Sequence, residues 1–96
     1  MEAVRSGSCY VTCGDRVHTI AWALFPNGRY SIAHDVDGVR VAGMSNLRRR
    51  DVARAAEAFV SSARTWCAED TRHTGVIKEV GVGELLADLE YIEEAI

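Results

Sequence analysis

The longest helical pattern in the chain lies between Ser45 and Asp70. Its apolar residues recur at i, i+4, i+7 and i+8, the spacing that gathers side chains on one face of a helix; they are Val52, Ala56, Phe59, Val60, Ala63, Trp66 and Cys67. The opposite face carries Arg50, Arg54, Glu57, Ser61 and Arg64. The pattern predicts one amphipathic helix of about six turns, long enough to cover a small sheet.

The residues before this helix alternate with the period of two that is typical of strands. Residues 1–7 show no period and are expected to lead into a first strand over residues 8–13. Gly14-Asp15 offers the Gly-X pair of a type II′ hairpin turn. A second strand is therefore predicted over residues 16–25.

The next turn, around Pro26-Asn27-Gly28, allows two loop lengths, and the hydrophobic pattern discriminates between them. A two-residue Asn-Gly loop would place Trp22 on the same face as the small residues of the third strand. A three-residue loop with Gly28 at positive φ places Trp22 on the same face as Ile32. The second arrangement buries more apolar surface, so it is the predicted register.

Asp37-Gly38 is the strongest hairpin signal, a type I′ turn that pairs Asp35 with Arg40. The expected core face of the third and fourth strands consists of Tyr30, Ile32, His34, Val36, Val39 and Val41. The expected reverse face consists of Ser31, Ala33, Asp35, Arg40, Ala42 and Met44.

Two further elements follow the long helix. Residues 74–82 hold four apolar residues and two glycines, a pattern that fits a short fifth strand or an extended link. The last helix is expected from Gly83 or Glu84 to Ile96, with an apolar line of Leu85, Leu89, Ile92 and Ile96. The predicted fold class is α+β, one domain over residues 1–96: a four-stranded antiparallel meander covered by one long helix, then a short strand or link and a C-terminal helix.

Composition restricts the possible classes of protein. The chain has 96 residues, 48% of them hydrophobic and 26% charged, which suits a single globular domain and argues against intrinsic disorder. No apolar stretch approaches the roughly 20 residues of a membrane span, and the first residues lack a hydrophobic leader. The expected location is the cytoplasm, or the host cytoplasm if the protein is phage-encoded. Three cysteines in such a chain predict reduced thiols, without a disulfide.

Charge is distributed unevenly along the chain. Residues 1–68 carry nine arginines and six acids, a balance of +3, whereas residues 69–96 carry two basic and eight acidic residues, a balance of −6. This asymmetry predicts either an internal electrostatic match or two docking surfaces of opposite charge. The candidate binding residues are Arg48, Arg49, Arg50, Arg54, Glu84, Asp88, Glu90, Glu93 and Glu94.

The arginines at positions 48–50 stand where a helix begins, although the positive end of the helix dipole favours carboxylates there. Only Asp51 satisfies that preference. Three explanations are open: the arginines contact the chain's own acidic C-terminal helix, they bind the acidic surface of a partner, or they bind nucleic-acid phosphates.

Residues 16–68 resemble the second half of a double-stranded-RNA-binding domain. The resemblance lies in a three-stranded meander, a Gly-x-Ser turn at Gly43-Met44-Ser45 and the basic, Ala-rich helix start RRRDVARAAEA. The initial helix of that family has no counterpart here. The resemblance implies that the arginines at 48–50 would bridge phosphates across an RNA groove, although a pI near 5.5 is low for a nucleic-acid-binding surface.

Metal binding and catalysis are not predicted. Cys9, Cys13, His18 and His34 fall on one sheet face, but two cysteines in one strand diverge and do not form a zinc knuckle. Buried histidines and small apolar cysteines are expected instead. The predicted pairing places Val11 opposite His18, so a cysteine–histidine dyad is not expected. The chain is predicted to be no enzyme and to use no cofactor.

The reverse sheet face is the remaining candidate surface. It is expected to be flat and nearly uncharged, with Ala21, Ala23, Phe25, Ala33, Ala42 and Met44. Two arrangements are open: this face is a protein interface or homodimer contact, or the C-terminal helix covers it.

In size, acidity and separated charge the chain is similar to phage-encoded inhibitors of the anti-CRISPR type. That resemblance implies a non-catalytic inhibitor that occupies a functional surface of a bacterial protein or ribonucleoprotein complex. The alternatives are a nucleic-acid-binding module and a small structural or oligomeric subunit, and no membrane partner is expected.

Overall fold

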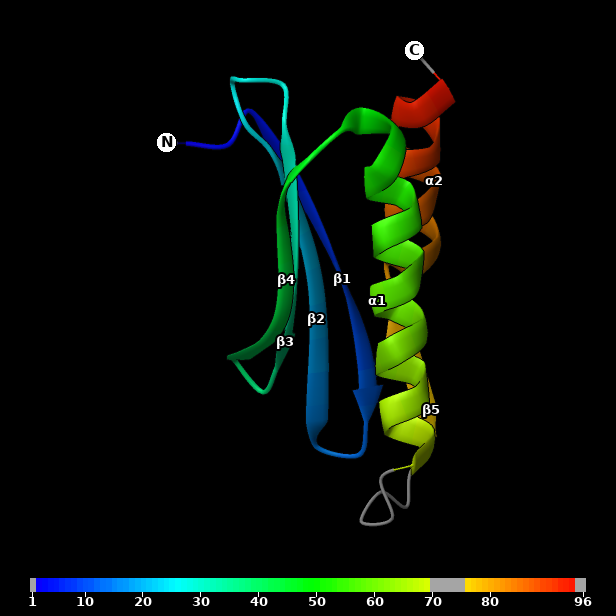
Figure 1. Cartoon of the computed structure of the whole chain (residues 1–96). Helices are drawn as coiled ribbons and strands as arrows, with labels where there is room; N and C mark the ends of the chain where they lie inside the picture. Colours follow the sequence, from blue (N-terminus) through cyan, green and yellow to red (C-terminus); the bar gives the residue numbers. More distant parts are fainter. Residues whose placement is uncertain (1, 70–75, 95–96) are drawn as a thin grey trace.

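A five-stranded antiparallel sheet with both helices on one face forms the protein (Figure 1). The computed structural model describes residues 2–69 and 76–94. The elements are β1 (Arg5–Cys13), β2 (Arg16–Leu24), β3 (Tyr30–Val36), β4 (Val39–Leu47), α1 (Arg49–Glu69), β5 (Ile77–Val80) and α2 (Val82–Glu94). The strand order is β4-β3-β2-β1-β5, so the predicted α+β class and four-stranded meander are confirmed.

The core lies between the sheet and the two helices. The strands supply alternate residues to it, as strand geometry requires, and α1 supplies a stripe that includes four alanines, which let the helix approach the sheet closely. The fully buried side chains include Cys9, Val11, Ile20, Ile32, Val52, Val60 and Leu89. A single layered core of this kind is what a chain of 96 residues can build.

The hairpin predictions are confirmed. Leu24 pairs with Tyr30 and Trp22 with Ile32, which is the register of the three-residue loop. Gly28 has a φ of 81°, and the Phe25 N–H donates to the Arg29 carbonyl across 2.9 Å. The Asp37-Gly38 turn has positive φ at both residues, as type I′ requires.

The face assignment along β4 was partly wrong because the strand contains two bulges. The partner of Asp35 is Arg40 and the partner of His34 is Ala42, so Val41 is an extra residue. Val41 is exposed, and Ala42 and Met44 pair with the core-facing His34 and Ile32 rather than with reverse-face residues. Val39 lies before the bulges and pairs with the buried Val36 as predicted, but it is itself exposed at the end of this edge strand. Bulges in this edge strand also discourage pairing with another sheet.

The element boundaries differ from the prediction at several places, and α2 begins at Val82 rather than at Gly83 or Glu84. β1 begins at Arg5, inside the expected lead-in. β4 continues to Leu47, so α1 begins at Arg49 rather than Ser45. Gly43-Met44-Ser45 therefore lies within a strand and does not form the turn expected from the resemblance to RNA-binding domains. For residues 74–82 the sequence allowed a short strand or an extended link. A strand forms over residues 77–80, where β5 pairs with β1.

The C-terminal helix lies beside α1, on the same face of the sheet (Figure 1). Val82, Leu85 and Leu89 are buried there. The alternative in which this helix covers the reverse sheet face was therefore wrong. Within the described residues that face has no helix over it, and we call it the open face.

Candidate functional site

Two histidines form a buried pair beneath α1. Nδ1 of His18 on β2 lies 2.8 Å from Nε2 of His34 on β3, and the two rings are 0% and 2% exposed. Alternation points both side chains into the core, and the β2–β3 register sets them on neighbouring strands. Burial lowers the pKa of His34, an effect that the nearby Asp35 carboxylate partly offsets.

Aromatic side chains of α1 cover the pair. The Trp66 ring centroid lies 5.2 Å from that of His18 and 6.1 Å from that of His34, in both cases nearly edge-on. Phe59 lies seven residues, about two turns, earlier on the same helix, with its ring centroid 6.4 Å from that of His34. These aromatic side chains therefore shield the histidine pair from one side, while Phe59 stays partly exposed and Trp66 is 37% exposed.

A disulfide joins Cys13 at the end of β1 to Cys67 near the end of α1. Their Cα atoms lie 5.8 Å apart, within the range of bridged cysteines. The prediction that all three cysteines are reduced was therefore wrong. Cys9 and Cys13 are four residues apart in one extended strand and do not bond to each other, but the helix brings the third cysteine, Cys67, onto the first strand. Disulfides are typical of oxidising compartments, so this bond does not support the predicted cytoplasmic location. That location stays a prediction.

Three potential metal ligands meet at this disulfide. Ligand atoms of Cys13, His18 and Cys67 all lie within 4.8 Å of one another, and all three residues are buried. The sequence pattern placed Cys13 and His18 on one sheet face, but it marked Cys67 only as an apolar position of the long helix. The available signal was that Cys67 ends the apolar stripe of the helix. Because that stripe packs on the sheet, Cys67 could be expected to face a strand, although the pattern does not say which one.

Cys9 is the free cysteine of the described chain, and it is buried. Burial, with a smaller contribution from Glu79, raises the pKa of its thiol to about 11. At neutral pH it is a protonated, inert group.

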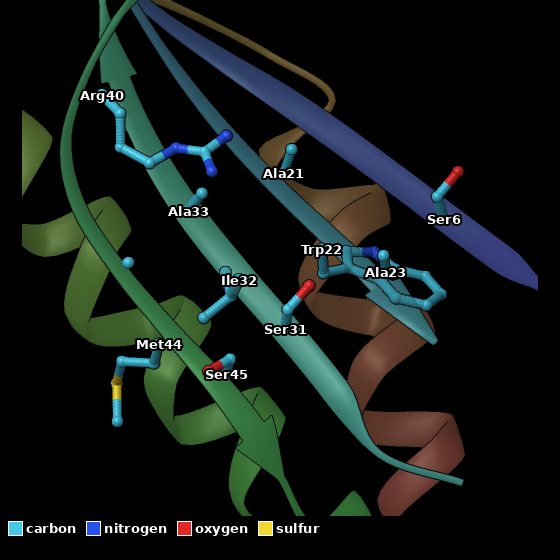
Figure 2. A pocket seen from close by; sticks show the side chains of 11 residues that line it. Ser6, Ala21, Trp22, Ala23, Ser31, Ile32, Ala33, Arg40, Met44 and Ser45 are labelled. Carbon is cyan, nitrogen blue, oxygen red and sulfur yellow. The ribbon is translucent and has the colours of Figure 1, made fainter. Parts of the chain in front are cut away.

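The open face contains a groove of about 470 Å³. Most of the lining residues are small, and Figure 2 shows the Arg40 side chain extending from β4 across Ala33. Nε of Arg40 donates to Asp35 across 3.0 Å, which holds the guanidinium against the sheet. The lining residues are Ser6, Ala21, Trp22, Ala23, Ser31, Ile32, Ala33, Arg40, Gly43, Met44 and Ser45.

Larger apolar side chains lie on the open face beyond the groove. Tyr10 of β1 and Val17 of β2 are exposed there, and Val80 of β5 pairs with Tyr10 at the same face. The predicted reverse-face residues Ala21, Ala23 and Ala33 belong to the groove. Exposed apolar side chains therefore lie on the open face beyond the groove as well as within it.

The predicted arginine cluster is exposed at the start of α1. Arg48 precedes the helix, its carbonyl accepting the Asp51 N–H at 2.9 Å, and Arg49, Arg50 and Arg54 follow along the first turns. Among the side chains that the structure describes, those of residues 2–69 and 76–91, no ion pair that includes these arginines is found. The helix end that carries them lies at the same end of the molecule as the C-terminal end of α2 (Figure 1).

The predicted acidic residues belong to α2. Glu84, Asp88 and Glu90 are exposed, and Glu93 and Glu94 lie in its last turn, where their side chains fall outside the described residues. Among the described side chains, Arg64 of the basic part and Glu79 of the acidic part form a bidentate ion pair, whose second bond runs 3.2 Å from the Arg64 Nη2 to the Glu79 Oε2. This pair lowers the pKa of Glu79 and raises that of Arg64.

Comparison with protein-family models, with curated proteins and with solved structures gives no match for this chain. No helix among the described residues is long and apolar enough to cross a membrane.

Proposed function

We propose that the chain is a non-catalytic protein-binding module that docks on its partner through the open face. The observation that carries this proposal is the placement of both helices on one side of the sheet, which leaves the groove and its apolar surroundings uncovered. Uncovered apolar surface that is flanked by polar residues is typical of protein interfaces.

The lining of the groove indicates the chemistry of the partner. Small side chains such as Ala21, Ala33 and Gly43 leave room for large apolar side chains from the other protein, the anchors that contribute most to interface energies. Arg40 is the charged residue of the lining, and a carboxylate of the partner can share its guanidinium with Asp35. A partner that presents aromatic or aliphatic side chains beside an acid fits this surface.

The non-catalytic part of the proposal is supported by the burial of the reactive groups. His18, His34 and Cys9 are enclosed in the core, and the Cys9 thiol is protonated at neutral pH. A nucleophile or general base must contact its substrate, and these side chains do not reach the surface.

The more specific form of the proposal is an inhibitor of the anti-CRISPR type, which blocks a bacterial protein or nucleoprotein complex. Its support is the separation of charge: Glu84 and Asp88, one turn apart, form an exposed acidic row on α2 that can imitate a nucleic-acid backbone toward a basic partner, and Glu90 adds an exposed carboxylate on another side of the helix. Binding through such a row weakens as ionic strength rises.

A second candidate function is nucleic-acid binding by the arginine cluster at 48–50 and 54. The observation that favours it is the exposure of all four arginines at the start of a helix, where N–H groups and guanidinium groups can meet phosphates. An RNA duplex would be bound by its shape and backbone.

Affinity capture from bacterial lysate, with and without nuclease, tests the proposal. The open-face variant is Ala33→Arg, which places a charge in the groove, and the matched control is Ser61→Arg on the exposed side of α1. We expect a partner that survives nuclease, is lost with Ala33→Arg and is kept with Ser61→Arg.

Three outcomes would contradict the proposal. Capture that disappears with nuclease would favour the nucleic-acid function, and capture that is indifferent to both substitutions would remove the open face from the interface. If the purified chain is a dimer and Ala33→Arg makes it a monomer, the open face binds a second copy and the chain is an oligomeric subunit.

A further inference from the structure

We propose that the reduced chain binds one zinc ion through Cys13, His18 and Cys67, and that the disulfide is the oxidised, metal-free form of the same site. The proposal rests on the convergence of three buried ligand atoms within 4.8 Å, contributed by β1, β2 and α1. It is independent of the proposed docking function, because the site lies on the helix side of the sheet.

The ligand types and their spacing suit zinc. Thiolate sulfur and imidazole nitrogen are its preferred ligands, with Zn–S near 2.3 Å and Zn–N near 2.0 Å. In a tetrahedron of those bond lengths the two sulfurs stand about 3.8 Å apart. Opening the bond between Cys13 and Cys67, whose Cα atoms are 5.8 Å apart, allows that separation by side-chain rotation alone.

The charge of the complex suits its burial. Two thiolates neutralise the double charge of Zn²⁺, and the imidazole of His18 is neutral as a ligand. A neutral complex avoids most of the cost of placing an ion in the core, whereas either thiolate alone would be an unpaired buried charge. The three residues are all buried, so this balance is needed at the site.

His34 orients the ligand imidazole without binding the metal. Its Nε2 lies 2.8 Å from Nδ1 of His18, so a proton on Nδ1 of His18 is donated to His34, and Nε2 of His18 is the nitrogen that serves the metal. Metal-ligating histidines usually donate their other N–H to an acceptor in this way. Trp66, edge-on to both rings, restricts their rotation.

The change between the two forms is balanced in electrons and protons. A cellular dithiol gives two electrons to the Cys13–Cys67 disulfide: the S–S bond breaks, two thiols form, and the dithiol becomes a disulfide. Zn²⁺ then binds both sulfurs and the His18 nitrogen, and the two thiol protons pass to water. Cys9 lies four residues before Cys13 in the extended strand β1, too far along the strand to be a fourth ligand. The three protein ligands therefore leave a fourth position for a water molecule.

Cobalt titration of the full chain tests the site. The protein is reduced with a phosphine, which takes up an oxygen atom from water as it opens the disulfide, and Co²⁺ is added under nitrogen. We expect one equivalent to give the intense visible bands of tetrahedral Co²⁺ and a thiolate-to-cobalt charge-transfer band, both removed by Zn²⁺. The oxidised chain should give neither band.

Variants assign the ligands. Cys67→Ala should abolish the charge-transfer band or reduce it to that of one thiolate, and His34→Gln should keep the band but weaken metal affinity about 10- to 100-fold. Cys9→Ala is the matched control, because Cys9 is equally buried and lies outside the cluster. It should bind cobalt as the parent does.

The proposal is overturned if the reduced parent gives no charge-transfer band, or if Cys9→Ala loses the band. It is equally overturned if Cys67→Ala binds as the parent does. Should circular dichroism show that Cys67→Ala does not fold, the comparison of oxidised parent, reduced parent and Cys9→Ala decides the question.

Discussion

His18 and His34 share one hydrogen bond, with Nδ1 of the first 2.8 Å from Nε2 of the second, and neither ring reaches solvent. One of the two facing nitrogens donates and the other accepts, so the contact needs one proton between them. A second proton would place two N–H donors face to face in the core. The hydrogen bond between the two histidines would then be lost.

The first prediction follows from the lowered pKa of His34. Burial, partly offset by Asp35, holds that pKa below 6.5, so the unfolded chain takes up a proton at higher pH than the folded chain. The free energy of unfolding should therefore fall as pH decreases from about 6.5 to the folded pKa, by about 1.4 kcal/mol for each unit of pKa depression, and then level off. Urea unfolding at about pH 7.5 and about pH 5 measures this.

His34→Gln supplies the control, because an amide can keep a hydrogen bond to His18 without titrating. The pH dependence of the variant should be weaker than that of the parent. Equal slopes in the two proteins would show that His34 does not couple folding to pH.

The disulfide supports the second prediction. It closes a loop between residues separated by 54 positions, and restriction of the unfolded chain by such a loop stabilises the fold by about 4 kcal/mol. Reduction should lower the urea midpoint strongly in metal-free buffer. Cys9→Ala, which leaves the bond intact, should keep this response, whereas Cys67→Ala should be as unstable as the reduced parent and insensitive to reductant.

Truncation of Trp22 and of Phe59 should lower the free energy of unfolding by different amounts, because Trp22 is buried and Phe59 is only partly buried. Trp22 is 3% exposed, so Trp22→Ala is expected to cost about 3–5 kcal/mol of unfolding free energy. Phe59 is only partly buried, and Phe59→Ala should cost roughly half as much. Chemical denaturation measures both values, and an unchanged midpoint for Trp22→Ala would contradict the β2–β3 register.

Gly7 gives an independent test of the same region. A Cβ at Gly7 would lie 2.6 Å from Nε1 of Trp22, so Gly7→Ala must displace the indole and should destabilise the fold by about 1–3 kcal/mol. Gly83→Ala is the matched control: nothing lies within 4 Å of its Cβ, and alanine suits α2 better than glycine. Similar destabilisation by both substitutions would show that the indole does not occupy this position.

The hairpin registers could be predicted because turn residues and alternation act locally. Gly28 and Asp37-Gly38 require specific backbone conformations, and once these are set, Trp22 must lie beside Ile32. The bulge at Val41 could not be predicted in this way, since no glycine or proline marks it and an edge strand lacks a second partner to fix its register.

The histidine and cysteine cluster depends on how α1 sits on the sheet, and no local rule determines that. The periodicity of the helix predicted that Cys67 faces the core, but not which strand it meets. In the structure Cys67 meets Cys13, and Trp66 beside it lies over His18. Contacts of this kind arise from the packing of whole elements, which the pattern of a single element does not contain.

The last prediction concerns the arginine cluster, where the sequence departs most from what helix stability favours. Replacing Arg48, Arg49 and Arg50 together by Glu places carboxylates at the positive end of the α1 dipole, which stabilises a helix by up to about 1 kcal/mol for each charge. Since no ion pair among the described side chains of residues 2–69 and 76–91 includes these arginines, the variant should fold as well as the parent or better. Thermal unfolding by circular dichroism measures this.

Binding assays on the same variant then separate the two candidate functions. If the parent binds duplex RNA with a steep salt dependence and the triple Glu variant does not, the cluster contacts phosphates, since each lost contact lowers the salt slope by about one. If neither binds RNA but the variant loses a protein partner, the arginines belong to a protein interface. Marked destabilisation would contradict both uses: the cluster would then be held by the acidic end of α2, which lies at the same end of the molecule (Figure 1).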